Sequence, residues 1–109
     1  MKRIEVEISA HHLDDVKERL RLIGIPGMTA STCSSLRERN EIYRGTVSTA
    51  ALVTRIRLDI VVTDDMVDNA VRAVLTVVRR DGGADGRIWI APVDTVVRIS
   101  TGEAGADAL

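Results

Sequence analysis

The spacing of the hydrophobic residues switches between two periods along this chain, in the same order twice, and this order constrains the fold more than any single motif. Residues 2–8 alternate strictly between apolar and polar side chains, which predicts a half-buried strand. Residues 12–23 then place apolar side chains at helical spacing, and Gly24 follows where a helix would end. A second strand is expected over 28–33, so the first half reads strand, helix, strand.

The second half of the chain repeats this order. Residues 54–62 alternate again and predict a strand, and we expect Asp64 or Asp65 to cap the helix that follows. A strand over 87–90 comes next, and 93–99 is expected to form a short C-terminal strand. The expected buried side of the second helix consists of Val67, Ala70, Val71, Val74 and Val78.

Two strand-helix-strand units placed side by side give an α+β fold, the ferredoxin-like β-α-β-β-α-β sandwich. In that fold two helices cover one face of a single sheet. A chain of 109 residues is one domain and has nothing left to cover the other face. We therefore expect a second subunit to cover it, and the protein to be an oligomer.

Residues 34–52 separate the two halves, and hydrophobic periodicity is absent there. The segment is charged at first and then small and polar, with Gly45 near its middle. An irregular loop of that length is uncommon in a small domain and is usually functional or mobile.

Composition excludes several classes of partner and compartment. The chain has no Phe, one Trp and one Tyr, too few aromatic rings for a base-stacking RNA platform, and its net charge of −1 is not that of a general DNA binder. We therefore expect no nucleic-acid partner. No apolar run could cross a membrane, so we expect a soluble, cytoplasmic protein that meets a membrane only through a partner.

The residues that usually carry catalysis or bind metals do not form a convincing set. His11 and His12 are adjacent and would point apart, and the single Cys33 has no evident basic partner. The carboxylate pairs Asp14-Asp15 and Asp64-Asp65 both fall at helix starts, where capping and the helix dipole account for them. We expect no metal site and no enzyme activity.

A glycine-rich turn over 81–87 is the most informative segment for ligand chemistry. Glycines let backbone N–H groups converge on an anion, and Arg87 could neutralise that anion. A glycine-rich turn is also a common connection, so phosphate binding and plain turn formation both remain open from the residues alone. Arg98 is a second candidate phosphate ligand, and its plain alternative is an exposed strand residue.

Six segments, taken in order, form a pattern more specific than any one of them: KRIEVEI, HLDDVKERLRLIGIPGMT, EIYRG, RIRLDIVVTDDMVDNAV, DGRIWIAPV and VVRISTGE. Together they resemble the PII signal-transduction family nearly end to end. The resemblance implies homotrimers of ferredoxin-like subunits, which agrees with the fold and the assembly expected above.

The resemblance also implies that adenine nucleotides (ATP, ADP or AMP) are effectors, bound in clefts between subunits. Residues 34–52 would be the mobile T-loop that contacts partner proteins, 81–87 the B-loop that holds phosphates, and 98–109 the C-terminal segment. The implied nucleotide-binding residues are Thr29, Asp59, Ile60, Val61, Ala84, Asp85, Gly86, Arg87, Arg98 and Ser100. The implied partner-binding residues in and beside the T-loop are Arg37, Arg39, Tyr43, Arg44, Ser48 and Arg55.

The chain departs from the family pattern at several of these positions. It contains no glutamine, whereas the family uses a T-loop glutamine to hold magnesium together with 2-oxoglutarate. Arg55 stands at the lysine that usually binds 2-oxoglutarate, and Ser48 stands at the tyrosine that is modified in many members. Ser100 and Ala84 replace an arginine and a glycine. We therefore expect 2-oxoglutarate sensing to be lost and leave a magnesium requirement open.

These observations lead to one hypothesis and two alternatives. The hypothesis is an adenine-nucleotide-sensing regulatory protein that controls a transporter, an enzyme or a transcription regulator in nitrogen metabolism. The first alternative is a PII-like sensor of inorganic carbon, serving bicarbonate uptake or carboxysomes and binding ADP or AMP. The second is a metal-responsive trimer of the same fold.

Overall fold

The computed structural model describes residues 1–25, 27–37, 41–43, 46–48, 51–80 and 86–109. Its strands and helices, in chain order, are β1 (Lys2–Ile8), α1 (Leu13–Leu22), β2 (Thr29–Arg37), β3 (Glu41–Tyr43), β4 (Thr46–Ser48), β5 (Ala51–Val62), α2 (Val67–Arg80) and β6 (Arg87–Pro92). Short 3-10 helices occupy Ala10–His12, Asp64–Met66 and Gly105–Ala108.

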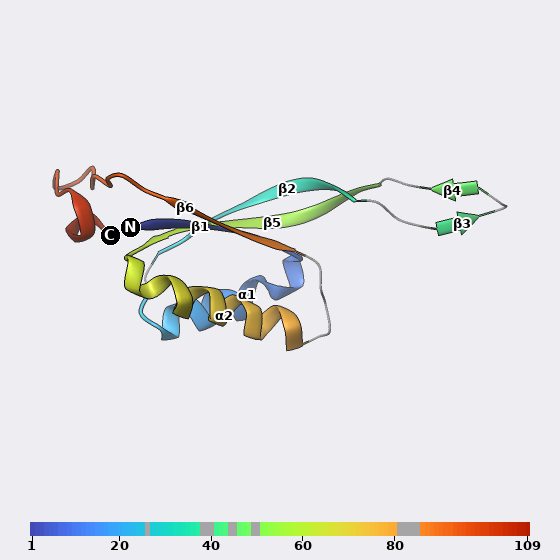
Figure 1. Ribbon diagram of the computed structural model, residues 1–109, viewed down its shortest axis with the longest axis horizontal. Coiled ribbons are helices and arrows are strands. Elements are labelled where there is room, and N and C mark those ends of the chain that lie inside the picture. The colour runs from blue at the N-terminus through green and yellow to red at the C-terminus, as the bar shows by residue number, and fades with distance from the viewer. Residues whose placement is uncertain (26, 38–40, 44–45, 49–50, 81–85) are drawn as a thin grey trace.

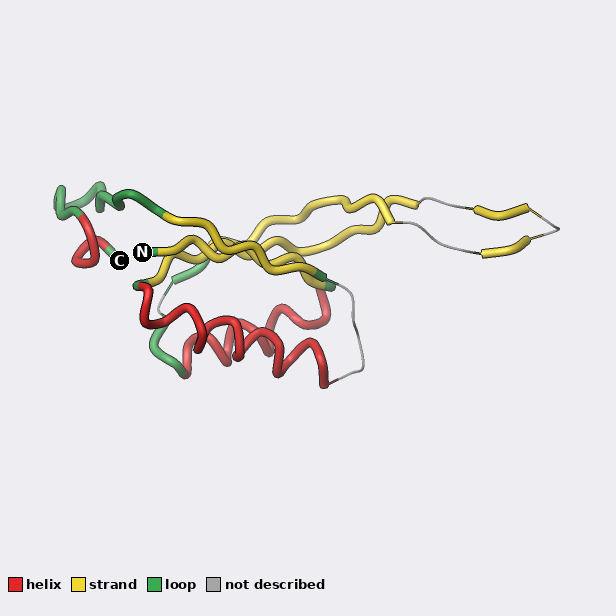
Figure 2. The backbone as a smooth tube through the Cα atoms, viewed as in Figure 1, coloured by secondary structure: helices red, strands yellow, loops and turns green. Residues whose placement is uncertain are grey.

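Four strands form one antiparallel sheet in the order β2-β5-β1-β6, and both helices cover the same face of it (Figures 1 and 2). β1 lies inside the sheet between β5 and β6, whereas β3 and β4 pair with each other. This strand order and the single helical layer are those of the ferredoxin-like sandwich. The predicted fold class is therefore confirmed.

The hydrophobic core lies between the sheet and the helices. Ile4, Val6 and Ile8 are at most 2% exposed, which confirms the alternation expected over 2–8. Two of the five residues expected on the buried side of α2 are fully buried, and the other three are half-buried. The buried side of α2 differs from the predicted one because α2 packs against α1 as well as against the sheet. The fully buried residues of α2 are Ala70, Ala73, Val74 and Val77.

The end of α1 follows the prediction. Gly24 has a φ of +92°, which an L-residue with a side chain rarely adopts. The Gly24 N–H donates to the Arg21 carbonyl (3.0 Å) and the Ile25 N–H to the Leu20 carbonyl (3.1 Å). These are the two hydrogen bonds of a Schellman cap, and they turn the chain from α1 back toward the sheet.

The start of α2 differs from the prediction that Asp64 or Asp65 caps it. Thr63 precedes a 3-10 turn there and no side chain makes a capping hydrogen bond. The Asp64 carboxylate lies 2.9 Å from the Met1 ammonium instead, and the hydrogen bond and charge of that ammonium lower the pKa of Asp64. The capping prediction was wrong because a partner distant in sequence occupies this carboxylate.

The prediction of an irregular segment over 34–52 was also wrong for the residues of that range that the structure describes. β2 continues to Arg37 and β5 begins at Ala51, and these two residues are paired. β3 and β4 form a further hairpin beyond them, so a two-stranded ribbon projects past the end of the helical layer (Figure 1). We call the described residues of 34–52 the arm. Leu36 and Leu52, which are paired at its root, are both more than 70% exposed, so burial does not produce a two-residue hydrophobic period at these positions.

The C-terminal segment forms a turn in place of the strand expected over 93–99. β6 extends through Pro92, which an edge strand tolerates. Val97 then makes a single bridge with Ala104, and the last residues form the 3-10 helix Gly105–Ala108. Figure 1 places this segment beside the N-terminus, at the end of the molecule opposite the arm.

Candidate functional site

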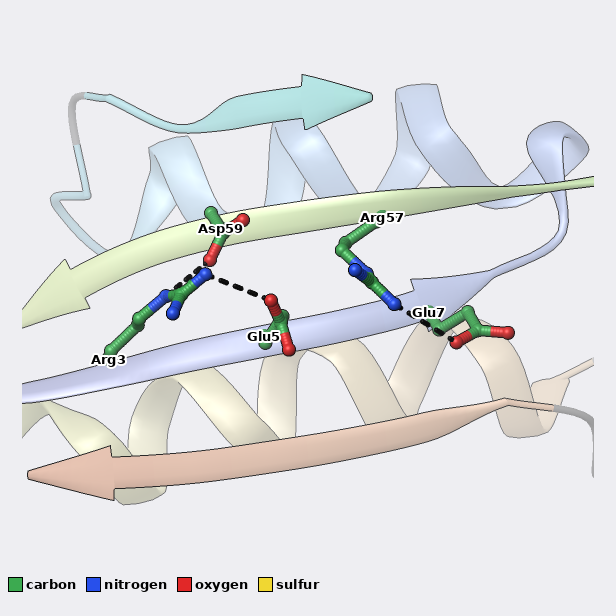
Figure 3. Close-up of polar contacts among 5 residues, drawn as sticks. All are labelled: Arg3, Glu5, Glu7, Arg57 and Asp59. Carbon is green, nitrogen blue, oxygen red and sulfur yellow. Dashed lines mark hydrogen bonds and ion pairs between the residues drawn. The ribbon is translucent and has the colours of Figure 1, made fainter. Parts of the chain in front are cut away.

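The sheet face opposite the helices, which we call the open face, carries charged side chains of both signs along β1 and β5. Arg3 Nε donates to Asp59 Oδ1 (2.7 Å) and Arg3 Nη2 to Glu5 Oε1 (2.9 Å), which raises the pKa of Arg3. Further along the same strands, Arg57 Nη2 lies 4.0 Å from Glu7 Oε2 (Figure 3). Two hollows border this charged ladder, one at each end of β1.

The first hollow brings together four residues that the resemblance assigned to nucleotide binding. Thr29 pairs with Asp59 in the sheet register, and Ile60 and Val61 follow on β5. The Ile60 side chain is 3% exposed and belongs to the core, so Ile60 can offer a ligand only its backbone. Gly27, Met28 and Arg3 complete the lining. This hollow lies at the N-terminal end of β1.

The second hollow lies at the other end of β1 and has a volume of about 360 Å³. It contains Gly86 and Arg87 together with Arg55, which is 3% exposed and donates from Nη1 to Ser9 Oγ (3.3 Å). Guanidinium groups in a partly enclosed hollow are suited to phosphate or carboxylate. Its other lining residues are Glu7, Ser34, Ser35, Leu36, Arg57 and Trp89.

Gly86 is required by the geometry of this hollow. Its φ is +142°, and a Cβ built there would collide with the backbone carbonyl oxygen of Glu7. Gly86 therefore lies closer to the backbone of β1 than any residue with a side chain could. Of the other residues assigned to the turn, Ala84 and Asp85 lie outside the described residues.

Replacing Gly86 with alanine is expected to lower the free energy of unfolding by about 2–4 kcal/mol, through both the backbone strain and the collision. Gly102→Ala is the matched control, because Gly102 also has a positive φ (+73°) but has open space around its Cβ position. It should cost about 1–2 kcal/mol. Urea denaturation of both variants measures the difference, and equal losses would show that the collision is relieved.

Arg98 and Ser100 lie in the C-terminal turn. Arg98 Nη2 donates to the Leu109 carbonyl oxygen (2.9 Å), and the Arg98 N–H donates to the Glu103 carbonyl (2.9 Å). Ser100 is exposed. The Val93 N–H donates to the Met1 carbonyl (3.1 Å), so the chain runs beside the N-terminus before it reaches Arg98.

Arg87 and Arg98 of one chain are far apart. Arg87 pairs with Glu7 and Pro92 with Lys2, so the two ends of β6 are separated by about 17 Å at the usual rise per residue. Arg98 lies beyond the Pro92 end. A single subunit therefore presents the two arginines at opposite ends of its sheet.

The residues assigned to partner binding lie mostly in the arm. Arg37 ends β2, Tyr43 ends β3 opposite Thr46, and Ser48 ends β4 opposite Glu41. Arg39 and Arg44 lie outside the described residues. Arg55 is the exception, because it lies in the second hollow at the root of the arm.

The sequence-based assignment missed Glu7, Ser35, Arg57 and Trp89, which line the second hollow. The strict alternation of 2–8 and 54–62 already placed Glu7 and Arg57 on the polar face of their strands. A polar strand face is also typical of a surface covered by another subunit, so the alternation alone does not indicate a ligand-binding role. The signal was present, but only the sheet register shows that the two residues are paired.

Within the part of the chain that the structure describes, no group of three or more His, Cys, Asp or Glu side chains could hold a metal ion. In the same residues, no helix is long and apolar enough to cross a membrane.

A projecting two-stranded arm is suited to contact another protein, and polar hollows at the ends of an open sheet face are suited to hold a small anion. Fold and site together are those expected of a small ligand-responsive regulatory protein. The model of the family "Nitrogen regulatory protein P-II" matches residues 1–103, and the chain belongs to that family. The resemblance inferred from the six segments is confirmed, and with it a nitrogen-regulatory signal-transduction function.

Curated relatives agree with this assignment over their whole length. Three relatives, each named nitrogen regulatory protein P-II, come from Cereibacter sphaeroides (37% identical), Azospirillum brasilense (35%) and Pasteurella multocida (36%). In each case the alignment covers 100% of this chain and 100% of the relative.

Proposed function

We propose that this protein is a single-domain, cytoplasmic sensor of adenine nucleotides that works as a homotrimer. Each nucleotide binds between two subunits, with its base and ribose in the first hollow and its phosphates on Gly86 and Arg87 of the second. Arg98 supplies a further guanidinium from a neighbouring C-terminal segment. The bound nucleotide changes the conformation of the arm, and with it the binding of the arm to a transporter, an enzyme or a transcription regulator.

One observation carries this proposal: the two hollows lie toward opposite ends of β1, one beside Arg3 and the other beside Glu7. One chain cannot close both around the same small molecule. In a ring of identical subunits, the end of one sheet adjoins the other end of its neighbour, and the two half-sites become one cleft. The open face between the hollows is also the surface that needs a second subunit to cover it.

The proposal extends to the effectors. Because the chain has no glutamine, we do not expect 2-oxoglutarate to be held through magnesium as in the family pattern. Magnesium would enter only as a partner of nucleotide phosphates. The protein acts by binding rather than by catalysis, and nucleotide occupancy is its signal.

Calorimetric titration of the full chain with AMP, ADP, ATP and 2-oxoglutarate, with and without magnesium, tests the proposal. We expect at least one adenine nucleotide to bind with one site per subunit, and 2-oxoglutarate to give only heats of dilution. The absence of nucleotide binding would overturn the sensing function. Tight, magnesium-dependent binding of 2-oxoglutarate would overturn the effector assignment alone.

A further inference from the structure

Glu7 occupies an unexpected place for a carboxylate. It is the one acidic side chain among the described residues that line the second hollow, where it lies with Arg55, Arg57 and Arg87. Its side chain is only 14% exposed. A negative charge inside a hollow suited to anions opposes anion binding, so its presence needs a reason.

Glu7 contacts three elements that meet at this hollow. Its Oε1 accepts a hydrogen bond from Ser35 Oγ at the root of the arm, and its Oε2 faces Arg57 Nη2 on β5 at 4.0 Å. Its backbone carbonyl lies against Gly86 in the 81–87 turn. One residue therefore joins the arm, the sheet and the proposed phosphate-binding turn.

The guanidinium groups around Glu7 are not fully paired by it. Arg57 Nε is buried and donates to no acceptor among the described residues. Arg87 makes no ion pair with any residue in the described ranges. A buried N–H without an acceptor is unfavourable, and an anionic oxygen entering the hollow would satisfy it. Such an anion would compete with Glu7 for Arg57.

We propose that Glu7 sets how many phosphate charges this site accepts, and that it reports occupancy to the arm through Ser35. This inference rests on the proposed nucleotide function. Because Coulomb repulsion grows with the charge of the ligand, a fixed carboxylate penalises ATP more than ADP and ADP more than AMP. A phosphate that takes over Arg57 also changes the partner of Glu7, and with it the Ser35 contact that anchors the arm.

Glu7→Gln tests whether the charge of Glu7 limits the number of phosphate charges that the site accepts. Glutamine keeps the shape and an oxygen acceptor for Ser35 but removes the charge. We expect affinity to rise about tenfold for ATP, about threefold for ADP and less than about twofold for AMP. Glu7→Asp keeps the charge, so its ATP-to-AMP affinity ratio should stay near that of the wild type. If both variants shift the ratio alike, Glu7 acts only through shape and the inference is wrong.

Glu5→Gln is the matched control. Glu5 lies two residues earlier on the same face of β1, but its carboxylate pairs with Arg3 and lies outside the second hollow. The variant should leave the affinity ratio unchanged. If the wild type binds nucleotides and Glu7→Gln has the same ATP-to-AMP affinity ratio as the wild type, this inference is wrong but the proposed function stands. No nucleotide binding by the wild type would refute the proposed function, and this inference with it.

Ser35→Ala tests the transmission half by amide hydrogen exchange over the paired residues of β2 and β5 in the arm. In the wild type, ADP should change exchange there at least about twofold, whereas in Ser35→Ala the exchange should be the same with and without ADP. Because Ser35 lines the second hollow, exchange is compared at ADP concentrations that saturate each variant, so that a change in ADP affinity does not enter the comparison. An undiminished ADP effect on exchange would show that Glu7 does not signal through Ser35.

Discussion

Two variants that each bind ADP poorly should regain binding when their subunits are mixed. Arg87→Ala and Arg98→Ala are each expected to weaken ADP binding about 10- to 100-fold, the usual cost of one charge-assisted hydrogen bond to a phosphate. Mixed trimers, prepared by joint refolding or co-expression with two tags, should bind ADP with wild-type affinity at a reduced number of sites. Calorimetry gives both the affinity and the stoichiometry.

The reason is the separation of the two arginines along one sheet. Arg87 lies at the Glu7 end of β1 and Arg98 lies beyond the Lys2 end, so one chain cannot supply both to one ligand. In a ring of three, each cleft takes Arg87 from one subunit and Arg98 from its neighbour. A trimer that contains both variants then has one intact cleft, so random mixing should restore about one quarter of the wild-type sites.

The control mixes Arg87→Ala with the double variant Arg87→Ala/Arg98→Ala. Those trimers contain no Arg87 and should recover nothing, although they assemble in the same way. If the first mixture fails to recover binding even though the tags demonstrate mixed trimers, Arg87 and Arg98 of neighbouring subunits do not contact the same ligand. The cleft between subunits would then be ruled out.

Much of the sandwich could be predicted from the sequence because burial imposes the hydrophobic period. β1 and the inner part of β5 each bury one face, so Ile4, Val6 and Leu58 recur every second residue and reveal the strands. Gly24 likewise marks the end of α1 because only its positive φ permits the cap. Where a local conformational requirement and a burial pattern indicate the same element, that element can be predicted from the sequence.

The same reasoning explains the failures. Leu36 and Leu52 at the root of the arm are paired but exposed, so burial imposes no hydrophobic period there, and only the register shows that the two strands are paired. Asp64 carries a capping signal, but the Met1 ammonium competes for it. Neither a pairing partner nor a competing charge can be identified from residues that are local in sequence.

The candidate site could be predicted from the sequence only in part. The family resemblance assigned Thr29, Asp59, Gly86 and Arg87 to nucleotide binding, and the structure places the first two in the first hollow and the last two in the second. The role of Glu7 could not be anticipated, because its neighbours come from three separate elements. A polar residue on a strand face is ambiguous until the fold shows what faces it.

Leu20→Ala is expected to cause one of the largest losses of stability of any single substitution, about 3–5 kcal/mol in the free energy of unfolding. Leu20 is 0% exposed, belongs to the core between α1 and the sheet, and its carbonyl accepts one of the two hydrogen bonds that cap α1. Alanine cannot fill the space, and the cavity beneath the sheet would lose its van der Waals contacts.

Leu22→Ala is the control, because Leu22 lies two residues later on the same helix but is 66% exposed. Both substitutions remove the same atoms and change helix propensity equally, so only burial separates them. Leu22→Ala should change stability by less than about 0.5 kcal/mol. Urea denaturation at one fixed protein concentration isolates the difference, because the stability of the proposed trimer would depend on concentration. Similar losses in the two variants would mean that α1 is not packed on the sheet as described. The support beneath β1, and hence the spacing of the two hollows, would then have to be reconsidered.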